Sequence, residues 1–264
     1  MLRRVAEVPI LPPETSPSGC QRVIRQQSAE AGEAVYRRIR ADVVQGRLAP
    51  GRKLGLDGLR QIYGVAVGTL REALNRLASE QFVVAEGQRG FRVAGVSIED
   101  FREIADLRLL LEGQAMALSF AAGDLDWEGR VVGAHHCLAV LERRLLAGEV
   151  VDPALWKRYD RAFHAALIEA CGSAVLLETH AAVHDRYLRY QMVALTFRGT
   201  LAAGEHAALL DCALRRDAAR AEAVLRAHLG GCLDHLMRVG ALQPFATRGP
   251  ALAPALPGTR RAQR

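Results

Sequence analysis

The sequence predicts a mainly α-helical chain in two parts: a small helical domain that ends in a β-hairpin, and a larger domain built only from helices. Three observations support this fold class. Apolar residues recur at helical spacing over most of residues 31–239, and two short β-rich runs occur at 82–86 and 90–94. No strand-like alternation follows residue 95.

The composition indicates where the domains begin and end, and it argues against a membrane protein or a disulfide-bonded secreted protein. We expect one domain over residues 30–95 and another over 98–240, with extended, disordered segments at 1–29 and 241–264, where Pro, Gly, Ser, Gln and Arg are frequent. No run of about 18 apolar residues is present, so no membrane span is expected. The five cysteines form no Cys-x-x-Cys pair, and the N-terminus lacks the apolar core of a signal peptide. A reduced, cytoplasmic protein is the expectation.

Charge is distributed unevenly between the two domains. Residues 1–95 carry 15 Lys and Arg against 9 Asp and Glu, whereas residues 96–240 carry 16 against 20. A basic first domain is suited to contact with a polyanion, and the acidic second domain is not.

The first domain begins with a predicted helix over about 31–45, where Val35, Ile39 and Val43 form an apolar stripe that ends before Gly46. A short helix over 57–63 is followed by a tight turn at 65–68 and a helix over 69–79. Two helices joined by such a turn form a helix-turn-helix, whose second helix enters the major groove of DNA.

The two β-rich runs are joined by Gly87-Gln88-Arg89, which predicts a hairpin with a polar tip. A hairpin directly after a helix-turn-helix makes a winged helix, and the wing reaches neighbouring DNA backbone or minor groove. Exposed arginines are also common on surfaces that bind nothing, so the helix alone is weak evidence. The candidate DNA contacts are Thr69, Arg71, Arg76, Gln88 and Arg89.

The second domain opens with a capping box, Ser97-Ile-Glu-Asp100. Its further predicted helices cover about 125–147, 153–171, 173–196, 201–215 and 217–239.

All eight histidines lie in this second domain. Asp160 and His164 are four residues apart, which places a carboxylate and an imidazole on one helix face, and His206 and His228 lie on later helices. Three nitrogen donors and one oxygen donor would suit Zn²⁺, Ni²⁺ or Mn²⁺. Spacing alone also allows hydrogen-bonded core histidines, or a site at His180 with His184 or at His135-His136.

Two motifs in the first domain carry a family resemblance. Residues 46–51, Gly-Arg-Leu-Ala-Pro-Gly, and residues 70–77, Leu-Arg-Glu-Ala-Leu-Asn-Arg-Leu, resemble the GntR family of bacterial transcription factors. The resemblance implies a homodimeric repressor or activator that binds a palindromic double-stranded DNA operator. Asp57 and Ala66-Val67 stand where members commonly carry arginine and a Ser/Thr-Arg pair, so the operator sequence is not implied.

The second domain is similar to the FCD domain, the ligand-binding module of the FadR-like GntR subfamily. The resemblance rests on Asp160-x3-His164, then Glu205-His206, then His228, and implies a divalent metal that binds a small carboxylate effector. It places Arg108 in the subfamily's first-helix pattern, and we expect Arg108 and Arg189 to clamp the effector; an Arg108–Glu112 pair within one helix is the alternative. Local similarity to the carbon-starvation regulator branch, which responds to glutarate, favours a C4–C6 dicarboxylate.

The sequence alone leaves two other functions open. A metal-dependent hydrolase or lyase on the bundle would need Asp160 or Glu205 as general base, and the site offers no clear carboxylate beyond its ligands. A nonspecific nucleic-acid-binding protein driven by the arginine-rich tails would bind any DNA equally. The expected protein is therefore a transcription regulator and not an enzyme.

Overall fold

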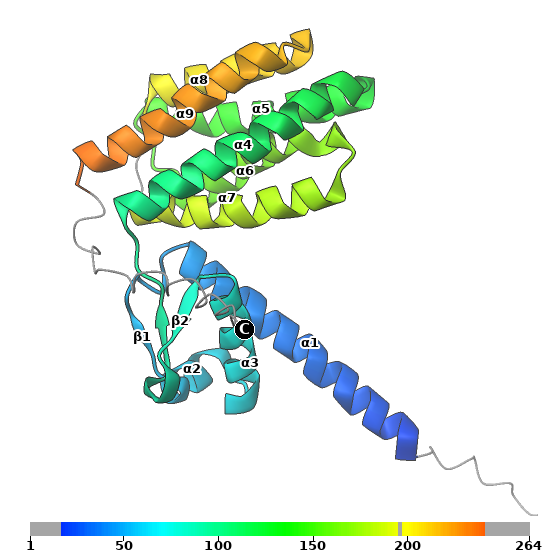
Figure 1. The fold of residues 1–264 in the computed structure, drawn as a ribbon, viewed down its shortest axis with the longest axis vertical. Helices are drawn as coiled ribbons and strands as arrows, with labels where there is room; N and C mark the ends of the chain where they lie inside the picture. The colour runs from blue at the N-terminus through cyan, green and yellow to red at the C-terminus, as the bar shows by residue number, and fades with distance from the viewer. Residues whose placement is uncertain (1–16, 195–196, 241–264) are drawn as a thin grey trace, which may run out of the picture.

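A computed structural model describes residues 17–194 and 197–240. The chain forms two bodies, a small domain with a three-stranded sheet and a larger helical bundle, and the N-terminal part of the long first helix projects away from both (Figure 1). The predicted fold class, a winged helix-turn-helix followed by an all-α bundle, is confirmed. Among the described residues, no helix combines the length and apolar character needed to cross a membrane.

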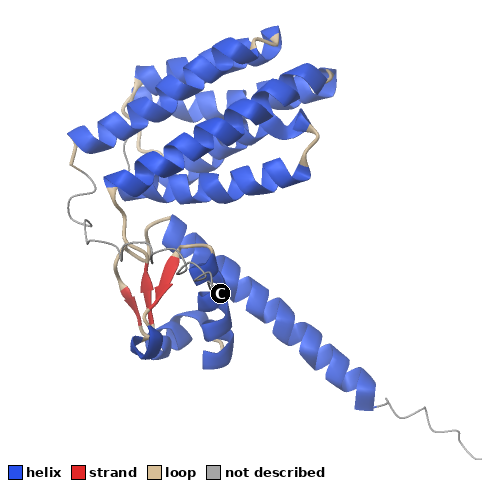
Figure 2. Cartoon of the chain, in the orientation of Figure 1, coloured by secondary structure: helices blue, strands red, loops and turns tan. Residues whose placement is uncertain are grey.

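The first domain contains three helices and a small antiparallel sheet of order β1-β3-β2 (Figure 2). Its elements are α1 (Pro17–Val44), β1 (Lys53–Leu54), α2 (Leu56–Tyr63), α3 (Val67–Ser79), β2 (Val83–Ala85) and β3 (Phe91–Val93). A single 3₁₀ turn, Gly87–Arg89, forms the tip of the wing between β2 and β3.

The core of this domain lies between α1 and α3. Ile39 of α1 and Leu70, Leu74 and Leu77 of α3 are fully buried, as their spacing on one face of each helix requires. The helix α2 ends at Gly64, which has a positive φ of 68° and donates its backbone N–H to the carbonyl of Arg60. That left-handed residue starts the turn into α3.

Two helix starts need correction. The first helix begins at Pro17 and not near residue 31, so residues 17–29 are helical and not a disordered extension. Adding residues to a helix that already exists costs far less than starting one. The helix α3 begins at Val67 and not Thr69. The strand β1, which the sequence analysis did not predict, is only two residues long and too short to show a pattern. Residues 1–16 and the predicted basic tail at 241–264 lie outside the described residues.

The bundle consists of α4 (Ile98–Ala122), α5 (Leu125–Leu146), α6 (Pro153–Ile168), α7 (Ala174–Ala194), α8 (Thr200–Arg215) and α9 (Ala218–Arg238). A 3₁₀ turn, Glu169–Cys171, separates α6 from α7. The predicted cap is present, since the backbone N–H of Asp100 donates to the Ser97 hydroxyl oxygen at 3.0 Å. Trp127, fully buried, ties α5 to α6 by donating its indole N–H to the Ala166 carbonyl at 2.8 Å.

The two domains meet along α7. Leu188 and Met192 of this helix are buried in the hydrophobic cluster of the first domain and not in that of the bundle. Beside them, the buried carboxylate of Asp185 accepts a hydrogen bond from Arg40 of α1. The helix α7 therefore belongs to the bundle by sequence and to both domains by packing.

Candidate functional site

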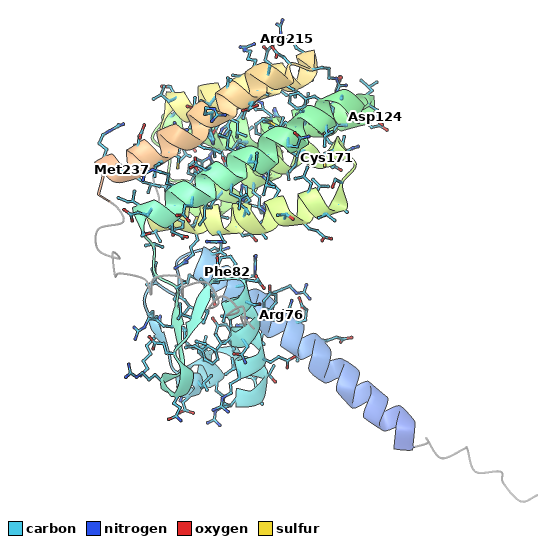
Figure 3. The ribbon with its side chains drawn as sticks, in the orientation of Figure 1. Arg76, Phe82, Asp124, Cys171, Arg215 and Met237 are labelled. Carbon is cyan, nitrogen blue, oxygen red and sulfur yellow. The ribbon has the colours of Figure 1, made fainter. Side chains whose placement is uncertain are left out.

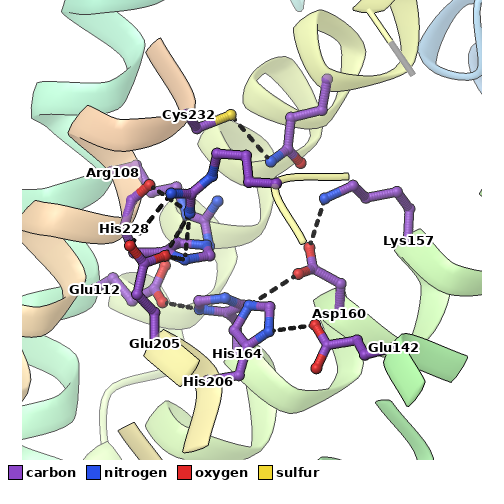
Figure 4. Close-up of polar contacts among 12 residues, drawn as sticks. Arg108, Glu112, Glu142, Lys157, Asp160, His164, Glu205, His206, His228 and Cys232 are labelled. Carbon is purple, nitrogen blue, oxygen red and sulfur yellow. Dashed lines mark hydrogen bonds and ion pairs between the residues drawn. The ribbon is translucent and has the colours of Figure 1, made fainter. Parts of the chain in front are cut away.

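The four predicted metal ligands come together inside the bundle (Figure 4). Asp160 and His164 lie on α6, His206 on α8 and His228 on α9, and one ligand atom from each lies within 4.8 Å of all the others. Every one of these side chains is at least 96% buried. Residues separated by up to 68 positions thus form one enclosed cluster.

Each of the three histidines has its Nδ1 atom held by a different carboxylate. The Nδ1–O distances are 2.5 Å for His164 to Glu112, 2.7 Å for His206 to Glu142 and 2.8 Å for His228 to Glu205. A carboxylate on Nδ1 fixes the orientation of the ring and leaves Nε2 as the lone-pair donor, which is the usual support for a metal-ligating histidine.

Ligand atoms in the cluster lack ordinary partners. The Nε2 atoms of His164 and His206 and the Oδ1 atom of Asp160 are buried without a hydrogen-bond partner among the described residues. His206 Nε2 faces Asp160 Oδ1 at 3.3 Å. Buried polar atoms are normally satisfied, and apart from this long His206–Asp160 ion pair the three atoms are not, which is the environment that a bound ion would complete. The donor set of three imidazoles and one carboxylate fits a divalent transition-metal ion.

The charge states of the histidines also fit a metal. Burial lowers the pKa of His164 and takes the pKa of His228 to about 3, so both rings are neutral and able to ligate near pH 7. Burial acts in the same direction on His206, but the carboxylates of Asp160 and Glu142 raise its pKa to about 9. The His206 proton occupies the place of a cation between two carboxylates, and a bound metal would replace it.

Other histidines that spacing could not exclude occupy different positions. His180 donates through Nε2 to Glu112 Oε2, 2.8 Å away, and so helps to hold the same carboxylate as His164. His135 packs edge-on against Phe163. His184 is buried next to the cluster, its ring centre 6.4 Å from that of His164, and neither of its nitrogens has a hydrogen-bond partner among the described residues.

Arg108 forms the intrahelical pair with Glu112 that was the alternative expectation, and Glu112 in turn holds His164 of the cluster. The Nε atom of Arg108 donates to Glu112 Oε2 at 2.8 Å, and its guanidinium lies 4.6 Å above the ring centre of Tyr187. Both terminal nitrogens are buried without a hydrogen-bond partner among the described residues. Because a guanidinium carries five N–H donors, the pair with Glu112 leaves most of its donors for a bound anion.

Arg189, the other predicted clamp residue, is not at this site. Its guanidinium donates to the backbone carbonyls of Ala94 and Gly95, in the segment that joins the two domains. The reason is helical geometry: Arg189 is two residues from Tyr187 and so projects about 200° away from it around α7. In this structure Arg189 therefore holds the interdomain segment, and its contact with an effector stays a prediction.

The predicted DNA contacts divide into two groups. Arg71 on α3 and Gln88 and Arg89 at the wing tip are exposed. Arg76, labelled in Figure 3, is engaged within the domain, because it forms an ion pair with Glu33 at 2.7 Å and its guanidinium lies 3.7 Å from the ring centre of Tyr36. Thr69 is half-buried and lies towards Gly32 of α1.

Comparison with known proteins agrees with this architecture. Residues 31–93 match the family described as "Bacterial regulatory proteins, gntR family", and residues 103–231 match the FCD domain. The uncharacterized HTH-type transcriptional regulator BphR of Paraburkholderia xenovorans (strain LB400) is 38% identical over 213 residues, which cover 80% of this chain and 87% of BphR. The HTH-type transcriptional repressor GlaR of Escherichia coli (strain K12) is 34% identical, over 74% of this chain and 90% of GlaR.

This chain belongs to the GntR family, in its FadR-like subfamily with an FCD domain. It is a DNA-binding transcription regulator. Two solved structures share its fold. A "putative transcriptional regulator GntR from Rhodococcus sp. RHA1" has a TM-score of 0.64 and 22% identity, and the match covers 78% of this chain and 97% of that chain. E. coli McbR/YncC has a TM-score of 0.65 and 19% identity, and the match covers 81% of this chain and 98% of that chain.

The structure of this GntR regulator adds Arg198, which the sequence analysis did not single out. Arg198 precedes α8 and donates to Glu205, the carboxylate that holds His228, and to the backbone carbonyl of His228 at 3.2 Å. Gly231 on α9 makes room for it: a Cβ there would lie 2.6 Å from an Arg198 nitrogen. No spacing rule links an arginine to a glycine 33 residues later, so only the fold reveals this contact.

We expect Gly231→Ala to displace the Arg198 guanidinium and loosen the His228–Glu205 pair. Losing the support of a metal-ligating histidine typically costs about 10–100-fold in metal affinity, measurable by competition with a chelating dye. Gly230→Ala is the matched control, because it adds the same methyl group to the same helix where nothing lies within 4 Å. Equal metal affinities in the two variants would contradict the role given to Arg198.

Proposed function

We propose that this regulator is a repressor whose operator affinity is set by a small dicarboxylate bound at a metal site in the FCD bundle. Asp160, His164, His206 and His228 would hold the ion, with Zn²⁺, Ni²⁺ and Mn²⁺ as the candidates. When bound, the ion supplies an open coordination position and positive charge for one carboxylate of the effector. The second carboxylate would pair with Arg108.

The observation that carries this proposal is a group of buried polar atoms near the four ligands that have no hydrogen-bond partner among the described residues. It includes Nε2 of His164 and both terminal nitrogens of Arg108, whose Nε pairs with Glu112, the carboxylate that holds His164. Both ring nitrogens of His184 also lack partners, and its ring centre lies 6.4 Å from that of His164. Leaving such atoms unpaired costs about 1–3 kcal/mol each, so a ligand that pairs them is bound strongly.

Repression is favoured by the likeness to GlaR, which is named a transcriptional repressor. A regulator bound to a palindromic operator needs two winged helices, and one bundle face offers a surface for a second copy. Leu107, Leu110 and Leu118 lie along one stripe of α4 and are 42%, 68% and 40% exposed. Exposed apolar side chains at helical spacing are typical of a helix that packs against a partner. We propose a homodimer through this stripe.

The metal and effector are tested together by thermal melting with mono- and dicarboxylates, before and after chelator treatment. A ligand at 100 times its Kd stabilises the folded state by about 2.7 kcal/mol, so an effector that needs the metal shifts the melting temperature only of metal-loaded protein. We expect a C4–C6 dicarboxylate to give this shift, and His206→Ala to abolish it. His136→Ala, at an exposed histidine outside the cluster, is the control.

Two results would contradict the proposal in different ways. If chelation lowers the melting temperature but no carboxylate shifts it, the ion is structural and the effector assignment is wrong. If chelation changes nothing and the protein binds no stoichiometric metal, the four residues are a hydrogen-bonded core and the metal assignment is wrong.

DNA docking through α3 predicts that Arg71→Ala weakens operator binding and lowers the slope of log K against log salt by about one, as expected for one lost phosphate contact. Arg76→Ala should change the slope less, because Arg76 is already paired with Glu33. Fluorescence anisotropy with a labelled operator at several salt concentrations measures both. An unchanged slope for Arg71→Ala would rule out this docking mode.

The dimer prediction is tested by Leu110→Glu. A carboxylate in the centre of an apolar interface would have to be desolvated, which costs several kcal/mol per buried charge, so we expect a monomer by light scattering and a loss of palindromic operator binding. Leu125→Glu is the control, because Leu125 is 80% exposed but lies outside the α4 stripe. A Leu110→Glu protein that remains dimeric places the interface elsewhere.

A further inference from the structure

A second cavity, separate from the metal cluster, lies where the DNA-binding domain meets the bundle. Its volume is about 470 Å³, within the range of pockets that hold small molecules. Residues of the last two turns of α1, together with Gln45 directly after it, form one wall, and residues at the start of α6 and in the second half of α7 form the others. Both domains therefore contribute to it, and a molecule bound there would touch both.

The lining of this interdomain cavity is strongly cationic. Five basic side chains face two carboxylates, those of Asp152 and Asp185. The basic residues are Arg37, Arg40, Lys157, Arg158 and Arg161. An excess of like charge around a concave space raises the local concentration of small anions.

Not all of this positive charge is neutralised by the protein. Asp185 accepts from both Arg40 and Arg161, so those three groups form a closed cluster. Arg158, in contrast, has no carboxylate partner among the described residues and donates only to the Tyr159 hydroxyl, at 3.3 Å. Arg37 forms a long ion pair with Glu33, 3.4 Å, while its side chain is 70% exposed.

Lys157 adds a buried positive charge to the cavity wall. The Lys157 side chain is only 8% exposed, and its ammonium nitrogen lies 3.4 Å from Asp160 Oδ2, a long distance for a charged hydrogen bond. The remaining lining is aliphatic, with Val44, Leu188 and Met192 among the contributors. A cavity with cationic groups at its edge and aliphatic walls suits an organic anion better than a bare inorganic ion.

We propose that this interdomain cavity is a second ligand site, which binds an organic anion with at least two negative charges, carried by phosphate or carboxylate groups. The planar guanidinium groups of Arg37 and Arg158 pair with either group in a bidentate manner. They belong to different domains, on α1 and α6, so one bound anion joins the DNA-binding domain to the bundle. None of the four proposed metal ligands lines the cavity, although Lys157 in its wall also contacts Asp160.

The consequence for DNA binding follows from linkage. An anion that bridges the two domains favours the arrangement seen here, in which α7 packs against α1. If the operator-bound protein has the same arrangement, anion and DNA strengthen each other's binding; if it has a different one, they weaken each other by equal factors. In either case, the anion affinity measured with and without operator must differ.

The test is isothermal titration of the full-length, chelator-treated protein at constant ionic strength. Citrate and ADP serve as the probes, since citrate offers only carboxylates and ADP offers a diphosphate. We expect one of them to bind, and we expect the Arg37→Ala/Arg158→Ala double variant to weaken that binding at least about tenfold, as the loss of charge-assisted pairs requires. Both side chains are exposed, so the variant should fold.

The matched control is Arg215→Ala/Arg226→Ala, which removes two exposed, paired arginines from the bundle surface; Arg215 lies at the end of the bundle away from the DNA-binding domain (Figure 3). The proposal is supported if the control variant keeps its affinity for the anion probe while the cavity variant loses it.

The proposal is overturned if both variants lose anion affinity equally, because that indicates general charge attraction. It is also overturned if neither citrate nor ADP binds. Weaker operator binding by the cavity variant without any anion binding would assign these arginines to DNA and also overturn it. None of these outcomes depends on the metal-effector screen.

Discussion

The position of α7 between the ligand cluster and the DNA-binding domain is the constraint on which the rest of the structure depends. His184 and Tyr187 face the space beside the metal ligands, whereas Asp185, Leu188 and Met192 face the first domain. The two sets interleave along one helix because successive residues project about 100° apart. Any ligand that repacks one face of α7 therefore moves the surface on which the DNA-binding domain rests.

The bundle core contains several buried charged side chains, and removing these charges from water opposes folding. Arg108, Glu112, Glu142 and Asp160 are all at most 2% exposed, although desolvating an ionised side chain costs several kcal/mol. Pairing among these groups offsets part of that cost, and burial, which raises the pKa of Asp160, is overcome by Lys157 and the neighbouring histidines. Hydrophobic side chains of similar volume would stabilise the fold as well or better. The cluster is explained more simply by ligand binding than by stability.

Much of the site was predictable because its information is local. The Asp160–His164 pair follows from spacing on one helix, and the family resemblance supplied His206 and His228. The carboxylates that hold Nδ1 were not predictable, since Glu112 and Glu142 come from helices whose register against α6 and α8 is set by packing. The contact of Arg189 with Ala94 and Gly95 was not predictable either, because it depends on how the interdomain segment lies against α7.

A chain of polar contacts connects the bundle to the DNA-binding domain across their boundary. Arg161 follows the ligand Asp160 on α6 and pairs with Asp185, which also accepts from Arg40 of α1. Arg40 in turn donates to Glu80, directly after α3, at 2.8 Å. These contacts form a continuous polar path from α6, which carries two of the proposed ligands, to the end of α3. Such a path is where allosteric coupling, typically about 1–3 kcal/mol, would be carried if effector binding moves α6.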